Sequence, residues 1–336
     1  MNFFTKIDIS AVNFKIDYTS RLAFFGSCFA DNISALFAER KFNVLANPFG
    51  TVYNPVSSAI QIKAIADGKI FGEEDVFQDT RCDGLWHCWD AHSSLSGKTK
   101  EECIGKLNAA TAQARDFLQK ANAIFITLGS AFVYYLKNSG KPAANCHRQD
   151  PRQFERRLIS VEEVAHAIRE IVENLRRITA TTENTNSHEP RIVFTVSPIR
   201  HKGDGAHGNN LSKATVLLGI EKAIAEIATS PLAPRNDTVD YFPSYEIVMD
   251  ELRDYRFYSD DMIHLSKTAE EYIFERMVET YCDSITRENI AKVEKFLKMA
   301  NHRIQDESSP ATQELKKKLA TQAAELERQI MGLKLG

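Results

Sequence analysis

The sequence predicts a doubly wound α/β fold, a three-layer arrangement in which helices cover both faces of a mostly parallel sheet. Two observations carry this prediction. Short apolar runs, each long enough for one strand, alternate along the chain with stretches in which apolar residues recur at helical spacing. The runs are nearly continuous in apolar residues, which is typical of parallel strands buried on both faces.

Each expected strand is an apolar run that leads into a turn residue. The first enters Gly26-Ser27 and the third enters Gly129-Ser130. Strands are expected at 22–25, 42–46, 123–128, 192–196 and 239–243.

The expected helices follow these strands. Phe29, Ile33 and Phe37 share one helical face after the first strand, and Asn54-Pro55 is a typical helix start. Helices are expected at 28–40, 55–66, 100–120, 161–178 and 211–228, with a polar linker at 179–190. The stretch 70–97 lacks clear periodicity and is interpreted as an irregular insertion.

The domain organisation follows from length and from the change of composition near the end. At about 150 residues per domain, 336 residues allow two domains or one enlarged α/β domain. We interpret residues 1–285 as one α/β domain and residues 286–336 as a C-terminal helical extension. The extension is rich in Lys, Glu, Gln and Ala, with leucines near heptad spacing. It is expected to pack on the main domain or on a second copy, which would give a homo-oligomer.

Composition excludes several classes of protein. The 42 basic and 45 acidic residues give a net charge of −3, so no broad basic field favours nucleic acid as a partner. No apolar run approaches the roughly 18 residues of a membrane span, and polar residues come too early for a signal-peptide core. Six cysteines without a CxxC pair are expected to be reduced thiols, and the expected location is the cytoplasm.

No metal and no cofactor are expected. Cys82, His87, Cys88 and His92 lie close in the sequence, but they lack the two spaced pairs of ligands that are typical of zinc sites. This segment is interpreted as a loop that covers part of the core.

One site is expected beyond the carboxyl ends of the strands, where the loops of a doubly wound sheet gather. Ser27 has the best setting for a nucleophile, because it follows a strand and opens a helix. A plain turn with a helix N-cap is the alternative reading. Cys28, which follows directly, is expected to point into the core. The four loops expected to build the site are Gly26-Ser27, Phe49-Gly50, Gly129-Ser130 and Ser197-Pro198.

A serine nucleophile needs a base and a group that orients the base. Asp261-x-x-His264 supplies both types, and Ser266 is expected to cap the helix that follows. A surface loop is the alternative reading. Arg200-His201 ends the fourth strand and is expected either to bind a carboxylate or phosphate or to form a salt-bridged rim. The glycine-rich stretch 201–208 is interpreted as a mobile loop, a candidate lid.

The chain resembles a known family in several segments between about residues 20 and 280. The string Gly26-Ser27-Cys28-Phe29-Ala30 is the signature that names the GSCFA family. Further matching segments are 47–55, Trp86-His87, His92-Ser93, 127–130, 145–147, 196–201, 210–213, 241–246 and Asp261-x-x-His264. That family looks like a branch of the SGNH/GDSL hydrolases, whose flavodoxin-like fold the predicted sheet would share.

The resemblance implies roles for individual residues. Ser27 matches the nucleophile, Asp261 and His264 the rest of the triad, and Gly50 the oxyanion-hole glycine beside the N–H of Ser27. The family pattern Gly-x-Asn-Asp is replaced by 129–132, Gly-Ser-Ala-Phe, so the usual asparagine donor is missing. Ser130 is our candidate to replace it, with Asn54 and Asn145 as alternatives. The residues expected to bind substrate are Asn54, His92, Gly129, Asn145, His147, Arg200 and His201.

The residues at the strand ends and the family resemblance together lead us to expect an SGNH-like esterase that removes O-acyl groups from a carbohydrate or small metabolite. Two alternatives stay open at the same cleft. The first is a catalytically weak or inactive ligand-binding relative, and the second is an O-acyltransferase. A structural protein that assembles through its C-terminal helices is a third.

Overall fold

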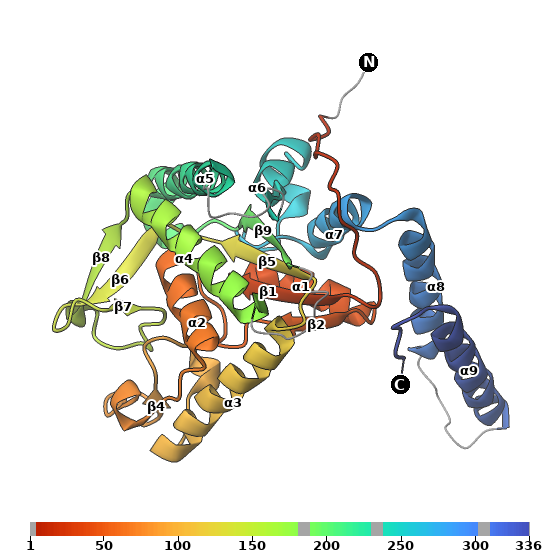
Figure 1. The fold of residues 1–336 in the computed structure, drawn as a ribbon, viewed down its shortest axis with the longest axis horizontal. Helices are drawn as coiled ribbons and strands as arrows, with labels where there is room; N and C mark the ends of the chain where they lie inside the picture. Colours follow the sequence, from red (N-terminus) through yellow and green to blue (C-terminus); the bar gives the residue numbers. More distant parts are fainter. Residues whose placement is uncertain (1–4, 181–188, 230–237, 302–309, 336) are drawn as a thin grey trace.

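A five-stranded parallel sheet forms the centre of the molecule and confirms the predicted three-layer α/β fold (Figure 1). The computed structural model describes residues 5–180, 189–229, 238–301 and 310–335. The strands in spatial order are β2 (Asn43–Ala46), β1 (Arg21–Gly26), β5 (Ala123–Leu128), β9 (Arg191–Val196) and β10 (Val239–Tyr241). All neighbouring pairs are parallel. Because the chain moves outward in both directions from β1 and β5, the order reverses between these two strands.

Helices cover both faces of this sheet, as predicted. One face carries α2 (Pro55–Asp67), α3 (Lys100–Leu118), α4 (Val161–Ala180) and α5 (Gly205–Thr229), and the other carries α1 (Cys28–Glu39) and α7 (Lys267–Tyr281). The short α6 (Ser244–Glu246) follows β10. Alternate side chains of β1 enter the two cores: Ala23 and Phe25 pack on the first face, and Leu22 and Phe24 on the second. Most of the linker expected at 179–190 lies outside the described residues.

Two parts of the main domain differ from the expectations. The stretch 70–97 contains a short antiparallel pair, β3 (Phe77–Gln78) and β4 (Trp86–His87). An unpredicted antiparallel sheet of β6 (Phe132–Leu136), β7 (Pro142–Ala143) and β8 (Phe154–Leu158) follows β5.

The glycine-rich segment interpreted as a mobile loop is in part helical, which corrects that prediction. Helix α5 begins at Gly205, so Gly208 lies within its first turn, and Lys202–Asp204 form a 3-10 turn before it. The positive φ of +64° at Gly205 shows why a glycine stands where the helix begins.

The C-terminal helices α8 (Ser284–Ala300) and α9 (Pro310–Gln329) lie side by side at one edge of the molecule (Figure 1). Ile290 and Val293 of α8 and Ile330 and Leu333 after α9 are buried in the same core as α1 and α7. The extension is therefore attached to the main domain through buried apolar side chains.

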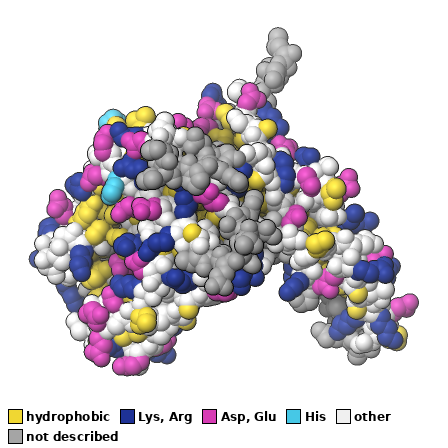
Figure 2. Space-filling model, in the orientation of Figure 1, with side chains coloured by type: hydrophobic (Ala, Val, Ile, Leu, Met, Phe, Trp, Pro, Cys, Tyr) yellow, Lys and Arg dark blue, Asp and Glu magenta, His cyan; other side chains and the backbone are white. Residues whose placement is uncertain are grey.

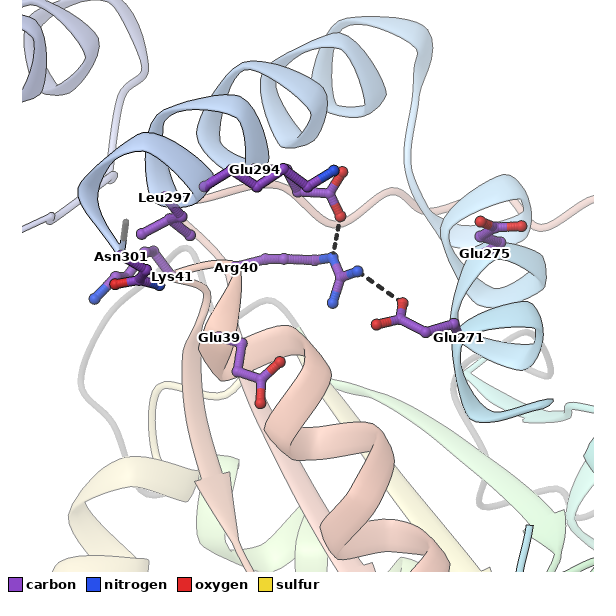
Figure 3. A pocket seen from close by; sticks show the side chains of 9 residues that line it. Glu39, Arg40, Lys41, Glu271, Glu275, Glu294, Leu297 and Asn301 are labelled. Atoms are coloured by element: carbon purple, nitrogen blue, oxygen red, sulfur yellow. Dashed lines mark hydrogen bonds and ion pairs between the residues drawn. The ribbon is translucent and has the colours of Figure 1, made fainter. Parts of the chain in front are cut away.

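Arg40 adds a polar attachment between the same elements. Its guanidinium contacts Glu271 of α7 at 2.7 Å and Glu294 of α8 at 2.6 Å (Figure 3). It also lies over the ring of Phe274. Arg40, Glu271 and Glu294 line a surface pocket of about 840 Å³ whose lining carries no hydroxyl, thiol or imidazole group. We therefore assign it no chemistry.

The surface agrees with the balanced composition. On the face drawn in Figure 2, basic and acidic side chains are intermingled. Within the described ranges, no helix is long and apolar enough to cross a bilayer. The six cysteines are all free thiols.

Candidate functional site

One pocket of about 380 Å³ opens where the ends of β1, β5 and β9 meet. Ser27 follows β1, Gly129 and Ser130 follow β5, and Ser197 follows β9, so three of the four predicted loops line it. His264, from the loop before α7, lines the same pocket. The pocket lies at the reversal of strand order, the usual ligand position in an open parallel sheet.

Gly26 sets the position of Ser27. Its φ of +123° is strained for other residues, and a Cβ atom there would lie 2.0 Å from the carbonyl oxygen of Thr127 on β5. Glycine therefore lets β1 end in close contact with β5. The N–H of Ser27 then donates to the same Thr127 oxygen at 3.2 Å.

Ser27 is the N-cap residue of α1, yet its hydroxyl makes no capping hydrogen bond. Its side chain is almost fully buried, and Oγ has no hydrogen-bond partner in the described part of the chain. Ser266, the predicted cap of α7, does accept a hydrogen bond from the N–H of Ala269 at 3.3 Å. An unpartnered buried hydroxyl is unfavourable, so its placement at the pocket requires an explanation beyond capping.

The Asp261-x-x-His264 loop brings the two side chains together. Asp261 Oδ2 contacts His264 Nδ1 at 2.6 Å, and Asp261 Oδ1 accepts the N–H groups of Ile263 and His264, each at 2.9 Å. These hydrogen bonds, foremost the one to His264, lower the pKa of Asp261 to about 2. Met262 has a left-handed φ of +59°, which closes the turn.

His264 is oriented by Asp261 but makes no hydrogen bond to Ser27 within the described residues; both side chains of the Asp261–His264 pair are about half exposed. The structure therefore contains one formed contact of the predicted triad, the one between Asp261 and His264. Ser27 and His264 thus line the same pocket without a direct hydrogen bond between them.

Two of the predicted oxyanion donors, the N–H groups of Ser27 and Gly50, already donate hydrogen bonds within the protein. The N–H of Ser27 donates to Thr127, and the N–H of Gly50 donates to the carbonyl oxygen of Asn47 at 2.7 Å. Gly50 is not part of the pocket lining; it packs against His92, whose Cβ would lie 2.3 Å from a Cβ at position 50.

Ser130 has a hydroxyl hydrogen that can reach the pocket. Its Oγ accepts the N–H of Phe132 at 3.0 Å and lies 3.1 Å from Ser212 Oγ, which accepts the N–H of Ala131 at 2.8 Å. When Ser212 donates to Ser130, the hydroxyl hydrogen of Ser130 has no partner in this network. In that arrangement Ser130 Oγ accepts hydrogen bonds from Phe132 and Ser212, and its own hydrogen can be donated to a ligand.

The residues predicted to bind substrate divide into two groups. Gly129, Arg200 and His201 line the pocket. Asn54, His92, Asn145 and His147 do not.

Local contacts account for each residue outside the pocket. Asn54 accepts the N–H of Ser57 as the cap of α2, and His92 caps the turn at 93–95. The buried His147 contacts the carbonyl oxygen of Cys88 at 2.8 Å and Ser93 at 3.1 Å, and burial lowers its pKa to about 4. Asn145 accepts the N–H of His147.

Cys28 lines the pocket beside Ser27, which corrects the expectation that it points into the core. It is half-buried, and burial raises the pKa of its thiol. A raised pKa disfavours the thiolate, so Cys28 lacks the activation of a cysteine nucleophile.

Lys213 is a residue of this region that the sequence analysis did not single out. Its side chain is buried, and Nζ donates to the carbonyl oxygens of Gly129 at 2.7 Å and Ser197 at 2.6 Å. Burial lowers its pKa to about 7. The signal was available, because Lys213 lies three residues before Val216 on the buried stripe of α5.

A group of possible metal ligands lies elsewhere and differs from the group considered from the sequence. Asp79, Asp83 and His87 bring their ligand atoms within 4.8 Å of one another. Asp79 already accepts the N–H groups of Arg81, Cys82 and Asp83. Cys82 instead contacts the carbonyl oxygen of Arg148.

The chain matches one known protein family. The family model described as the GSCFA family matches residues 21–277, which include the whole central sheet and the pocket lining. No curated protein and no solved structure matches the chain.

Proposed function

The chain belongs to the GSCFA family, and on that premise we propose that it is a serine esterase that removes an O-acyl group from a carbohydrate or small metabolite. The observation that carries the proposal is the buried Oγ of Ser27, which has no hydrogen-bond partner among the described residues, in a pocket that His264 also lines. The family match by itself supports membership and leaves the reaction open.

The proposed reaction has two steps. His264 Nε2 accepts the proton of Ser27 Oγ as Oγ attacks the acyl carbon, and the proton then passes to the departing alcohol. Water, deprotonated by His264, next attacks the acyl-serine ester, which releases the carboxylic acid and restores Ser27. Asp261 holds the Nδ1–H of His264 and stabilises the imidazolium that forms in both steps.

The negative charge on the acyl oxygen needs donors in the pocket. We propose that the Ser130 hydroxyl takes the place of the missing asparagine, because Ser130 lines the pocket and its hydroxyl hydrogen can be free. The N–H of Ser27 contributes only if it gives up its 3.2 Å bond to Thr127.

Covalent labelling tests this proposal directly. The wild-type protein, Ser27→Ala, His264→Ala and the control Ser94→Ala are treated with a fluorophosphonate, and the modified peptide is identified by mass spectrometry. The expected result is one adduct on Ser27 that Ser94→Ala retains and that His264→Ala loses. An adduct on another residue, or labelling of Ser27 that is independent of His264, would contradict the proposal.

A ligand-binding relative or an O-acyltransferase is the second candidate. It is favoured by the absence of the asparagine donor and by the internal hydrogen bonds of the Ser27 and Gly50 N–H groups. Correctly folded protein without an adduct would support the binding protein. An adduct followed by transfer of the acyl group to an added alcohol, with little hydrolysis, would support the transferase.

A further inference from the structure

The pocket at Ser27 has an unbalanced charge. Arg200 and Lys202 line it, and Lys213 lies buried behind the Gly129 and Ser197 carbonyls of its wall. Among the described residues that line the pocket, none is Asp or Glu. The surface of the pocket is therefore basic, although the whole chain has a net charge of −3.

Among the described residues, Arg200 has only neutral partners. Its Nη1 donates to Asn210 Oδ1 at 3.1 Å, and its Nη2 lies 3.4 Å from the sulfur of Met249. Within the described ranges, no carboxylate lies at ion-pair distance from it, in contrast to Arg40, which contacts two. The remaining N–H donors of its planar guanidinium group are therefore available to bind an anion.

Lys213 is a buried amino group that is positively charged below about pH 7 and that, among the described residues, also lacks an ion-pair partner. Both of its hydrogen bonds go to neutral carbonyl oxygens, and no ion pair to it exists in the described part of the chain. Arg200 also lowers the pKa of Lys213, whereas Cys28 and Asp204 raise it. When Lys213 is protonated, its charge and that of Arg200 repel each other, and an anion that enters the open pocket stabilises both.

Two carboxylates near the pocket have partners of their own. Asp204 is paired with Arg156 and lies 3.1 Å from His201, and Asp261 holds His264. Asp204 raises the pKa of Lys213, against the larger effect of burial. Within the described residues, neither carboxylate forms an ion pair with Arg200 or Lys213, so the positive charge of Arg200 is left for a ligand to balance.

We propose that the substrate of this pocket is a small ester that carries a negatively charged group, a carboxylate or a phosphate, and that Arg200 binds this group while Lys213 adds to the positive potential. That the substrate is an ester rests on the proposed function. That it carries a negative charge rests on the basic side chains of the pocket. A volume of about 380 Å³ is near the lower end for ligand pockets, which favours a small metabolite. The guanidinium fork suits a bidentate carboxylate or phosphate.

The kinetic experiment compares two esters of equal shape. The 4-nitrophenyl ester of succinic acid carries a free carboxylate, and the 4-nitrophenyl ester of 4-methylpentanoic acid carries an isopropyl group in its place. The wild type is expected to prefer the charged ester by about 10- to 100-fold in kcat/KM, since one charge-assisted hydrogen bond contributes roughly 1.5–3 kcal/mol. Arg200→Gln should lose the preference, and Arg200→Lys should keep part of it.

Arg256→Gln is the matched control, because Arg256 pairs with Asp254 outside the pocket and its loss removes the same charge. It should keep the full preference. Equal rates for both esters in the wild type, or a preference that Arg200→Gln retains, would overturn the inference while leaving the esterase proposal intact.

A binding measurement separates this inference from the proposed function. Ser27→Ala, which keeps the basic groups, is titrated calorimetrically with monomethyl succinate and with inorganic phosphate, and so is Ser27→Ala with Arg200→Gln. Binding of either anion that requires Arg200 supports the inference even if no ester is hydrolysed, and the stronger ligand tells carboxylate from phosphate. Absence of binding for both anions would overturn it.

Discussion

Lys213 Nζ donates a 2.6 Å hydrogen bond to the carbonyl oxygen of Ser197, and a second hydrogen bond connects it to Gly129. One ammonium group thereby joins the ends of β9 and β5 in the wall of the pocket. A group with a pKa of about 7 thus lies behind the wall of the pocket that Ser27 lines, so its ionisation affects both stability and the potential in the site.

The pKa of Lys213 predicts a pH-dependent stability. The unfolded chain binds the lysine proton up to about pH 10.4, whereas the folded protein releases it near pH 7, so wild-type stability rises with pH between these values. Relative to Lys213→Met, the wild type should gain about 3 kcal/mol between pH 7 and pH 9.5. Urea unfolding at both pH values measures this change, with Lys222→Met, a partly exposed lysine on the same helix, as control. A constant difference between wild type and Lys213→Met would contradict the lowered pKa.

Asp261→Asn should reduce esterase activity strongly without unfolding the protein. The amide cannot hold the imidazolium of His264, and comparable losses in serine hydrolases are on the order of 10⁴-fold in kcat. The side chain is about half exposed, so thermal unfolding should change little. Asp260→Asn, an adjacent exposed carboxylate, is the control and should keep normal rates. Equal activity of both variants would exclude Asp261 from the triad.

Ser130→Ala should lower kcat by about 10²- to 10³-fold, the usual cost of one oxyanion donor. Ser212→Ala leaves the Ser130 hydroxyl in place and removes its partner, together with the acceptor of the Ala131 N–H, so its loss of kcat should be smaller. Steady-state kinetics of the two variants distinguish a donor from a structural serine. A larger loss in Ser212→Ala than in Ser130→Ala would indicate that the pair acts only through packing.

Gly26→Ala should destabilise the fold by at least about 3 kcal/mol, because the methyl group would meet the Thr127 carbonyl and φ is unfavourable. Gly140→Ala is a control for backbone strain alone. Its φ is +67° and nothing lies near the added Cβ, so a loss of about 1 kcal/mol is expected. Denaturant titration gives both values, and similar losses would show that β1 can move away from β5.

Cys28→Ala should leave the fluorophosphonate adduct on Ser27 unchanged. The thiol of Cys28 has a raised pKa and remains protonated at neutral pH, so it is a poor nucleophile. Mass spectrometry of the labelled peptide and the rate of alkylation by iodoacetamide are the two measurements. Loss of labelling in Cys28→Ala, with Ser27→Ala still labelled, would transfer the nucleophile role to Cys28.

Much of the fold was predictable because its signals are local. Continuous apolar runs give β1, β5 and β9, and helical spacing gives α1 and α4, within a few residues of their bounds. The sheet β6–β8 was missed because its strands are only partly buried and because β6 pairs with β8 across the segment that contains β7. The start of α5 was missed because glycine at Gly205 and Gly208 indicates a loop, whereas the tertiary structure continues the helix.

The sequence by itself determined which residue types stand at the strand ends, and hence that Ser27, Ser130, Arg200 and His264 would meet at one edge of a parallel sheet. Only the tertiary structure decided how the polar groups of the predicted site are used: Ser27 Oγ finds no partner in the described part of the chain, the Gly50 N–H closes a turn, and His147 contacts Cys88. The physical reason is that side-chain identity is encoded locally. Hydrogen-bond partners, burial and pKa depend on atoms that are distant in sequence, as the approach of Lys213 to Gly129 and Ser197 illustrates.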